Sequence, residues 1–420
     1  MTTSPHLAVS PIPPAALRAA LDSPDSIYVY DLERLRRRCR MVTEMPIARK
    51  RVFFATMAND HPEVLACVRD CGLGVFVNSA YHLDLTLGLG FSPDRIVYAA
   101  SNMAPDQLAR CVELGVHLVL DSLGQLRSLS AVLADGAAAA GPVDVGVRVN
   151  VGSALDGSEL RLDPGYRFGL LESELPTAVA TARRAGVRIV GLHCYFGTDV
   201  RRPEVLLHGL ERLIGASGQV PDLRYLDVGG GFGVPEDLGA PEFDLATYQR
   251  GAAALLAAGT RGAREPVTLY VEPGRYLAAD CGYYFVKVVD VKVRADRVFV
   301  GTNGSVAEFP RPLFYPERAR HACEIVSPGA STTAHELPVF VCGNTTYSQD
   351  FLARGITLPL PVPGDTLVLH HAGAYGRSMA TRFLGRSMPA EVVTDPGADQ
   401  ERPDDPSLLT PTAVPQEAQA

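Results

Sequence analysis

The chain has 420 residues, of which 47% are hydrophobic and 20% charged, so it is long enough for a full-sized core and two domains. Its formal net charge of −8 argues against a nucleic-acid partner, because phosphate backbones require clustered cationic side chains. No apolar stretch approaches the roughly 20 residues that a membrane helix needs, and the first residues do not resemble a signal peptide. The eight cysteines form no Cys-x-x-Cys pair, so we expect a cytoplasmic protein with reduced thiols and no metal site.

A short strand at residues 26–31 follows an N-terminal segment, residues 1–25. The next stretch is basic, and its arginines are typical of a solvated helix face. A nucleic-acid contact explains them less well, so we assign them no ligand. These arginines are Arg36, Arg37, Arg38 and Arg40.

From residue 51 onward, short β-rich runs alternate with amphipathic segments such as 62–72, 104–115 and 203–215. Many βα units in a row favour closure of the sheet, so the pattern predicts a (β/α)₈ barrel. An open, doubly wound sheet is the alternative. The runs begin near Arg51, Leu73, Arg95, His117, Val143, Arg188, Arg224 and Val267.

The first of these runs ends at an informative residue, Met57. Residues 51–59 read Arg-Val-Phe-Phe-Ala-Thr-Met-Ala-Asn, an apolar strand followed by a small polar turn. Barrel enzymes present catalytic side chains at such positions. A thioether can neither form an imine with an aldehyde nor shuttle a proton, so Met57 excludes that chemistry here.

Two later motifs indicate an anion site at the same end of the barrel. Gly229, Gly230 and Gly231 directly follow the run 224–228, and glycine lets backbone N–H groups approach a phosphate closely. Glu272-Pro-Gly-Arg275 closes the last barrel run and places a carboxylate beside a guanidinium. A plain glycine turn and a structural ion pair are the alternatives for these motifs.

After Glu272, the βα pattern gives way to longer runs of alternating apolar and polar residues, which predict a C-terminal β-domain over residues 272–394. These runs lie at 283–293, 298–301, 338–341 and 365–370. Residues 395–420 are rich in Pro, Asp, Glu, Gln and Ala without apolar periodicity, so we expect a disordered tail. Acidic residues of this tail carry most of the net negative charge. The net negative charge of the whole chain therefore says little about which partners the folded part binds.

The motifs together resemble the fold-type III pyridoxal phosphate (PLP) enzymes of the ornithine/diaminopimelate/arginine decarboxylase family. That family carries Phe-Tyr-Ala-Val-Lys-Ala-Asn at the first strand, Glu-Pro-Gly-Arg, and a C-terminal Gly-Ala-Tyr that matches residues 373–375. The resemblance spans nearly all of residues 26–393. It implies an alanine racemase-like PLP-binding barrel over 26–271, whose first strand joins the β-domain, and a homodimer with sites built from two chains.

The resemblance also implies roles for individual residues. Glu272 would face the pyridine nitrogen, and Tyr195 would stack on the ring in place of the family's histidine. Thr346 replaces a proton-donating cysteine that the family contributes across the dimer, beside Tyr347 and Asp350. The phosphate would be held by Thr198, Gly229, Gly230, Gly231, Arg275 and Tyr375.

Met57 stands where the family has its Schiff-base lysine, and nearby departures suggest that this loss is native rather than engineered. Phe76 replaces an aspartate, which without the lysine would be a buried unpaired charge. His82 replaces a glutamate, and Phe383-Leu384 replaces Tyr-Asn. The three lysines, Lys50, Lys287 and Lys292, are not placed to substitute.

Three hypotheses follow. The favoured one is a divergent PLP-dependent decarboxylase of an amino acid or an amine-bearing intermediate, which holds PLP non-covalently. The alternative is a catalytically silent family member that acts as a partner subunit or binds PLP or a phosphorylated metabolite. The third is cofactor-free acid–base chemistry by His82, Tyr195, Tyr347 and Asp350, which predicts activity independent of PLP.

Overall fold

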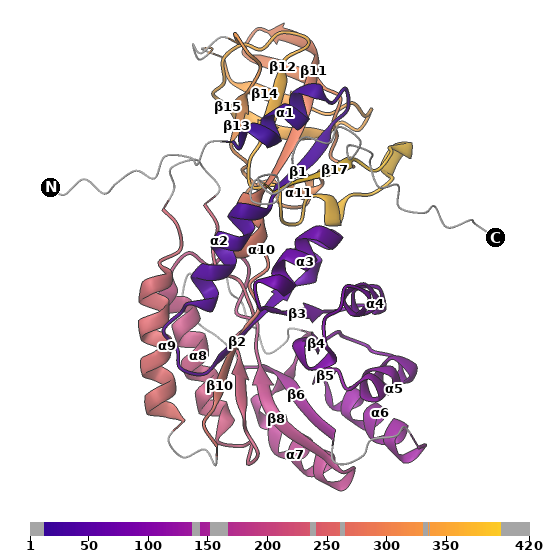
Figure 1. The fold of residues 1–420 in the computed structure, drawn as a ribbon, viewed down its shortest axis with the longest axis vertical. Helices are drawn as coiled ribbons and strands as arrows, with labels where there is room; N and C mark the ends of the chain where they lie inside the picture. Colours follow the sequence, from indigo (N-terminus) through magenta and orange to yellow (C-terminus); the bar gives the residue numbers. More distant parts are fainter. Residues whose placement is uncertain are drawn as a thin grey trace, which may run out of the picture.

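The computed structural model describes residues 12–136, 143–151, 167–235, 241–260, 265–330, 335 and 337–395. These residues form a barrel, drawn in the lower part of Figure 1, and a mixed β-sheet above it. The chain starts in the sheet, builds the barrel, and returns to the sheet. This arrangement confirms the predicted (β/α)₈ barrel with a C-terminal β-domain.

The barrel is a closed ring of parallel strands, in which the pairing of β5 with β6 completes the circle. Each predicted βα run corresponds to one of its strands. Most of these strands are buried along almost their whole length, as expected where helices cover a parallel sheet. The strands are β2 (Lys50–Ala55), β3 (Gly74–Val77), β4 (Ile96–Tyr98), β5 (His117–Leu120), β6 (Val143–Asn150), β8 (Val187–His193), β9 (Tyr225–Asp227) and β10 (Thr268–Val271), and β7 (Leu170–Leu171) pairs outside the ring with β6.

Helices surround this ring, and local sequence signals set where several of them begin. Pro62, Pro105 and Pro203 occupy first-turn positions, where the missing N–H costs no hydrogen bond. Ser79 and Ser122 cap two others by accepting backbone N–H groups. The helices are α2 (Leu32–Thr43), α3 (Pro62–Asp70), α4 (Ala80–Gly88), α5 (Pro105–Leu114), α6 (Leu123–Ala134), α7 (Leu175–Arg184), α8 (Pro203–Ser217) and α9 (Leu245–Gly259).

The second sheet contains the N-terminal strand β1 (Ile27–Asp31), which runs antiparallel to β11 (Gly282–Arg294) and parallel to β17 (Ala390–Thr394). The strand β1 thus pairs with two strands of the C-terminal part of the chain. The remaining strands of this sheet are β12 (Arg297–Thr302), β13 (Cys323–Ile325), β14 (Val339–Cys342), β15 (Phe351–Ile356) and β16 (Thr366–Leu369). The shorter helices are α1 (Pro14–Asp22), α10 (Arg275–Ala278) and α11 (Arg311–Phe314).

The prediction of a fully solvated basic run on α2 is wrong for Arg38. This side chain is 5% exposed and forms ion pairs with Asp280 at 2.7 Å and Glu242 at 2.9 Å. It thereby ties α2 to the segment after β10. The predicted tail beyond Asp395 lies outside the described residues. Within the described ranges, no helix has the length and apolar character to cross a membrane.

Candidate active site

A cavity of about 1030 Å³ opens where the barrel strands end and the β-domain begins. The carboxyl ends of barrel strands are where such folds place their active sites. The cavity brings together predicted site residues that are far apart in the sequence. It is lined by Met57, Tyr195, Thr198, Gly230, Gly231, Glu272, Arg275 and Tyr375, among others.

Met57 faces this cavity from a single 3₁₀ turn, η1 (Thr56–Ala58), that directly follows β2. Three hydrogen bonds hold the turn against the β-domain. Ser378 Oγ lies 3.1 Å from both the Met57 and the Ala58 carbonyl oxygens, to which it donates, and the Tyr375 N–H donates to the Ala58 carbonyl at 2.8 Å. The position of the family's lysine is thus held at the cavity wall, and a thioether occupies it.

No lysine among the described residues lines the cavity. Lys50 Nζ donates to the Met45 carbonyl at 2.6 Å, and Lys287 Nζ donates to Thr366 Oγ1 at 2.8 Å. Lys292 pairs with Asp290 at 3.0 Å. All three ammonium groups are engaged elsewhere, so none supplies the missing amine.

The triple glycine forms a turn packed tightly between two other loops. A Cβ on Gly230 would lie 2.4 Å from the Glu272 carbonyl oxygen, and one on Gly231 would lie 2.1 Å from the Gly197 carbonyl oxygen. Both contacts are too close for any side chain. Gly229 does not line the cavity but shapes the turn, with φ of 65° and its N–H donating to Asp227 Oδ1 at 2.9 Å.

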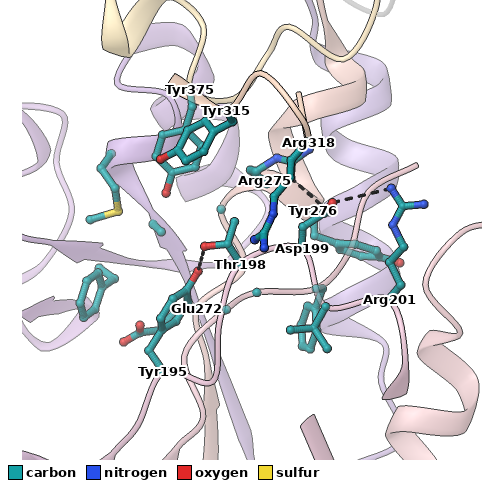
Figure 2. Close-up of a pocket in the computed structure, with 18 of the residues that line it drawn as sticks. Tyr195, Thr198, Asp199, Arg201, Glu272, Arg275, Tyr276, Tyr315, Arg318 and Tyr375 are labelled. Atoms are coloured by element: carbon teal, nitrogen blue, oxygen red, sulfur yellow. Dashed lines mark hydrogen bonds and ion pairs between the residues drawn. The ribbon is translucent and has the colours of Figure 1, made fainter. Parts of the chain in front are cut away.

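Arg275, Thr198 and Tyr375 line the same cavity, and Figure 2 shows Thr198 lying between Tyr195 and Tyr375. Arg275 is 8% exposed, and its Nη1 lies 3.1 Å from Asp199 Oδ1. The Thr198 hydroxyl lies 2.8 Å from the hydroxyl of Tyr195. Burial raises the pKa of Tyr375, so its hydroxyl stays protonated and can donate a hydrogen bond.

His193, Asp227 and Glu272 form a buried cluster at the cavity floor, with ligand atoms within 4.8 Å of one another. His193 Nε2 lies 3.4 Å from Glu272 Oε2 without hydrogen-bond alignment, and Glu272 Oε1 has no hydrogen-bond partner among the described residues. Such a set could also ligate a metal ion, which the sequence did not suggest.

Burial dominates the electrostatics of this cluster. It raises the pKa of Glu272 to about 8 and raises that of Asp227 well above its usual value, to which the charge of Glu272 adds. It lowers the pKa of His193 to about 4. At neutral pH, His193 is therefore neutral and the carboxyl pair retains a proton that can be given to a basic atom in the cavity.

Sequence reasoning missed His193 and Asp227, although each is the last residue of a barrel strand, β8 and β9. That position is itself a signal, since strand ends face the barrel mouth. It also missed the arginines and Asp199 that line the outer part of the cavity. They lie in loops, where no periodic pattern marks them.

The residues predicted to act across a dimer lie outside this cavity, on the β-domain. Thr346 and Tyr347 are exposed. Asp350 is 5% exposed, and its carboxylate accepts the N–H groups of Val306 at 2.8 Å and Thr345 at 2.9 Å. Its carboxylate therefore organises its own chain, and its catalytic role stays a prediction.

The cofactor-free hypothesis receives little support from this geometry. Of its four residues, only Tyr195 lines the cavity. His82 lies on α4, where its Nε2 is 3.8 Å from the carboxylate of Asp60. A general acid and a general base must both reach the reacting atoms of one substrate, and these side chains do not converge on one cavity.

Residues 32–279 match the family model described as "Pyridoxal-dependent decarboxylase, pyridoxal binding domain". A diaminopimelate decarboxylase from Actinosynnema pretiosum subsp. auranticum is 32% identical over 400 residues, covering 92% of this chain and 87% of that protein. One from Methanothermobacter thermautotrophicus is 29% identical over 388 residues, with 88% and 87% covered. The crystal structure of a Helicobacter pylori diaminopimelate decarboxylase shares the fold, with a TM-score of 0.81, 21% identity, and coverage of 90% of this chain and 93% of that one.

Proposed function

Because the chain belongs to the pyridoxal-dependent decarboxylase family, we propose that it is a divergent member that holds PLP without a covalent link and decarboxylates an amino acid or an amine-bearing intermediate. The family's pyridoxal binding domain confirms the expected cofactor, PLP. The observation that carries the proposal is the shared cavity, where Met57 faces all the candidate cofactor-holding residues except Gly229.

The charged groups of the cavity fit the two ends of this cofactor. At one end, Arg275, Thr198 and Tyr375 offer a guanidinium and two hydroxyl donors to a phosphate, beside the glycine loop. At the other end, Glu272 Oε1 is buried and has no hydrogen-bond partner among the residues that the structure describes, as expected of a group that faces a ring nitrogen. Between them, Tyr195 presents an aromatic face for stacking.

When bound, PLP supplies an electron sink for the bond that breaks at the substrate α-carbon. Glu272 then has one task, which is to keep a proton at the pyridine nitrogen. Its raised pKa allows it to arrive protonated and to stabilise the resulting positive charge afterwards as a carboxylate. His193, neutral and packed parallel to Phe76 with ring centroids 6.0 Å apart, closes the floor against water.

Met57 sets the limit on the rate. Its thioether can contact the cofactor but cannot exchange with a substrate amine, so substrate entry and product release both lack the usual amine catalyst. We therefore expect slower turnover than in relatives with a lysine. Phe76 also lines the cavity, and its apolar side chain cannot take over the role of that amine.

We further propose a homodimer, although the cavity as described needs no residue from a second copy. Tyr347, Phe383 and Leu384 are 36%, 45% and 51% exposed, and the Tyr347 and Phe383 rings contact each other edge to face at 5.7 Å. An exposed apolar cluster of this kind is typical of a protein interface. Thr346 and Tyr347 would then face the partner's substrate, and a monomer in sedimentation analysis would remove that role.

A catalytically silent member is the second candidate, favoured by Met57 at the lysine position. The retained Glu272 favours catalysis, because a simple phosphate binder does not need a proton at a ring nitrogen. The test is CO₂ release from a panel of amino acids with PLP added. Release that is abolished by Glu272→Ala and unchanged by the surface variant Glu113→Ala supports the proposal, and no release from any amino acid supports silence. We also propose an amino-acid-like substrate and a cytoplasmic location.

A further inference from the structure

The outer part of the cavity contains a cluster of exposed arginines that cofactor binding does not use. We infer that these residues form a second anion subsite, which binds a phosphate group at the distal end of the substrate. This assignment of substrate class rests on the proposed function, since it takes the inner part of the cavity as the cofactor site. The outer subsite consists of Arg201, Arg202, Arg318 and Arg320.

Two segments far apart in sequence converge to build this subsite. Arg201 and Arg202 immediately precede α8, and Arg202 is its N-cap residue without a side-chain cap. The N-terminus of this 15-residue helix adds its partial positive charge to theirs. Arg318 and Arg320 come from the turn after α11, where the Arg318 N–H donates to the Tyr315 carbonyl at 3.0 Å.

The side chains that line the cavity carry more positive charge than one phosphate group can neutralise. Among the described residues, seven arginines line the cavity against three carboxyl groups, of which Glu272 stays protonated at neutral pH. The lining thus carries an excess of at least four positive charges in a chain whose formal net charge is −8. The phosphate of PLP carries at most about two negative charges. A cavity that concentrates positive charge in this way attracts anions with more than one charged group.

Asp199 divides the inner phosphate site from the outer subsite. Its carboxylate lies between Arg275, at 3.1 Å, and Arg201, at 3.7 Å, as Figure 2 shows. The residue has a φ of 60°, a strained value for a non-glycine residue, and Val234 N–H donates to its Oδ1 at 2.8 Å. One carboxylate therefore contacts one arginine of each site and keeps the two positive centres apart.

Arg202 and Arg320 carry most of the proposed binding. Both are exposed at the cavity mouth, and neither has an ion pair or side-chain hydrogen bond among the described residues. Arginine presents a planar fork of donors that matches a phosphate in two-point contacts. A substrate ending in an ammonium group would instead be repelled by this rim.

The size of the cavity supports a substrate longer than a simple amino acid. Its volume of about 1030 Å³ lies just above the roughly 300–1,000 Å³ that ligand pockets occupy. PLP and a small amino acid leave part of such a space unfilled. A phosphate-bearing substrate would fill the remainder and place its charge at the arginine rim.

The test is calorimetric titration of inorganic pyrophosphate, glutarate and cadaverine into protein saturated with PLP. The absorbance of PLP gives the cofactor loading in a separate measurement. We expect pyrophosphate to bind at least tenfold more tightly than glutarate, and cadaverine not to bind. The double variant Arg202→Gln/Arg320→Gln should weaken pyrophosphate binding at least tenfold without changing PLP absorbance. Arg294→Gln, an exposed arginine of the β-domain, is the matched control.

The outcomes separate this inference from the proposed function. Equal pyrophosphate binding by wild type and double variant overturns the subsite while the cofactor proposal stands, and glutarate binding as tight as pyrophosphate overturns the phosphate assignment. If PLP does not bind but pyrophosphate binding still depends on the two arginines, the proposed function fails and the anion subsite stands.

Discussion

Replacing Glu272 by glutamine tests the electrostatics of the cavity floor before any ligand is added. Burial raises the pKa of this carboxyl from 4.5 to about 8, so the unfolded chain releases the proton first as pH rises. The contribution of Glu272 to the free energy of unfolding therefore falls between pH 4.5 and about 8, by about 1.4 kcal/mol per pH unit.

His193 acts with the opposite sign over part of this range. Burial lowers its pKa from 6.5 to about 4, so its contribution to stability rises with pH within that window and is constant above it. The two effects offset each other below pH 6.5. Above pH 6.5, His193 no longer offsets the loss from Glu272, which amounts to roughly 2 kcal/mol by pH 8. Asp227, whose pKa burial also raises, contributes a loss of the same sign to the wild type.

The assay is urea unfolding of the ligand-free protein at pH 6.5 and pH 8. We expect the wild type to lose roughly 2 kcal/mol more than Glu272→Gln over this interval. Glu113→Gln, on the exposed surface of α5, should behave as the wild type does. If wild type and Glu272→Gln change equally between the two pH values, Glu272 is already ionised in the empty cavity and the reasoning is refuted.

Three further substitutions test other parts of the account. Met57→Lys should attach PLP to the chain through a link that borohydride makes permanent, and peptide mass mapping should place the adduct on residue 57. An unmodified mass would show that this position does not face the cofactor. Arg275→Gln should weaken PLP binding at least tenfold in an absorbance titration, because it removes a charge-assisted contact of about 1.5–3 kcal/mol, and unchanged affinity would place the phosphate elsewhere. Arg38→Leu should lower the free energy of unfolding by about 3 kcal/mol, since it leaves two carboxylates without their buried partner, and a loss below about 0.5 kcal/mol would contradict that role.

The barrel was predictable because local sequence patterns mark its strands. A strand such as Lys50–Ala55 is buried over most of its length and reads as an apolar run, while Pro62 and Pro105 mark where the next helices begin. The short strand Cys323–Ile325 and the strand Phe351–Ile356 were not predicted. Both are only partly buried along much of their length, so they lack the alternation that marks a strand.

The site was predictable where a motif ends a strand, as at Glu272 and the triple glycine. It was not predictable where long-range partners decide the role of a side chain. Arg38 looks like a surface residue until its carboxylate partner Asp280, far away in the sequence, is placed beside it. Asp350 likewise looks available for catalysis until its hydrogen bonds to Val306 and Thr345 are seen.

The central claim is that the cavity binds PLP although Met57 cannot attach it. The direct measurement is purified protein mixed with PLP, passed over a desalting column after borohydride treatment, and compared with an untreated sample by absorbance and intact mass. We expect the untreated sample to show saturable PLP binding with the spectrum of the free aldehyde. We expect this binding to be weaker in Arg275→Gln, and the protein mass to be unmodified after borohydride. Absence of binding, or a reduced adduct on one of the three lysines, would contradict the account.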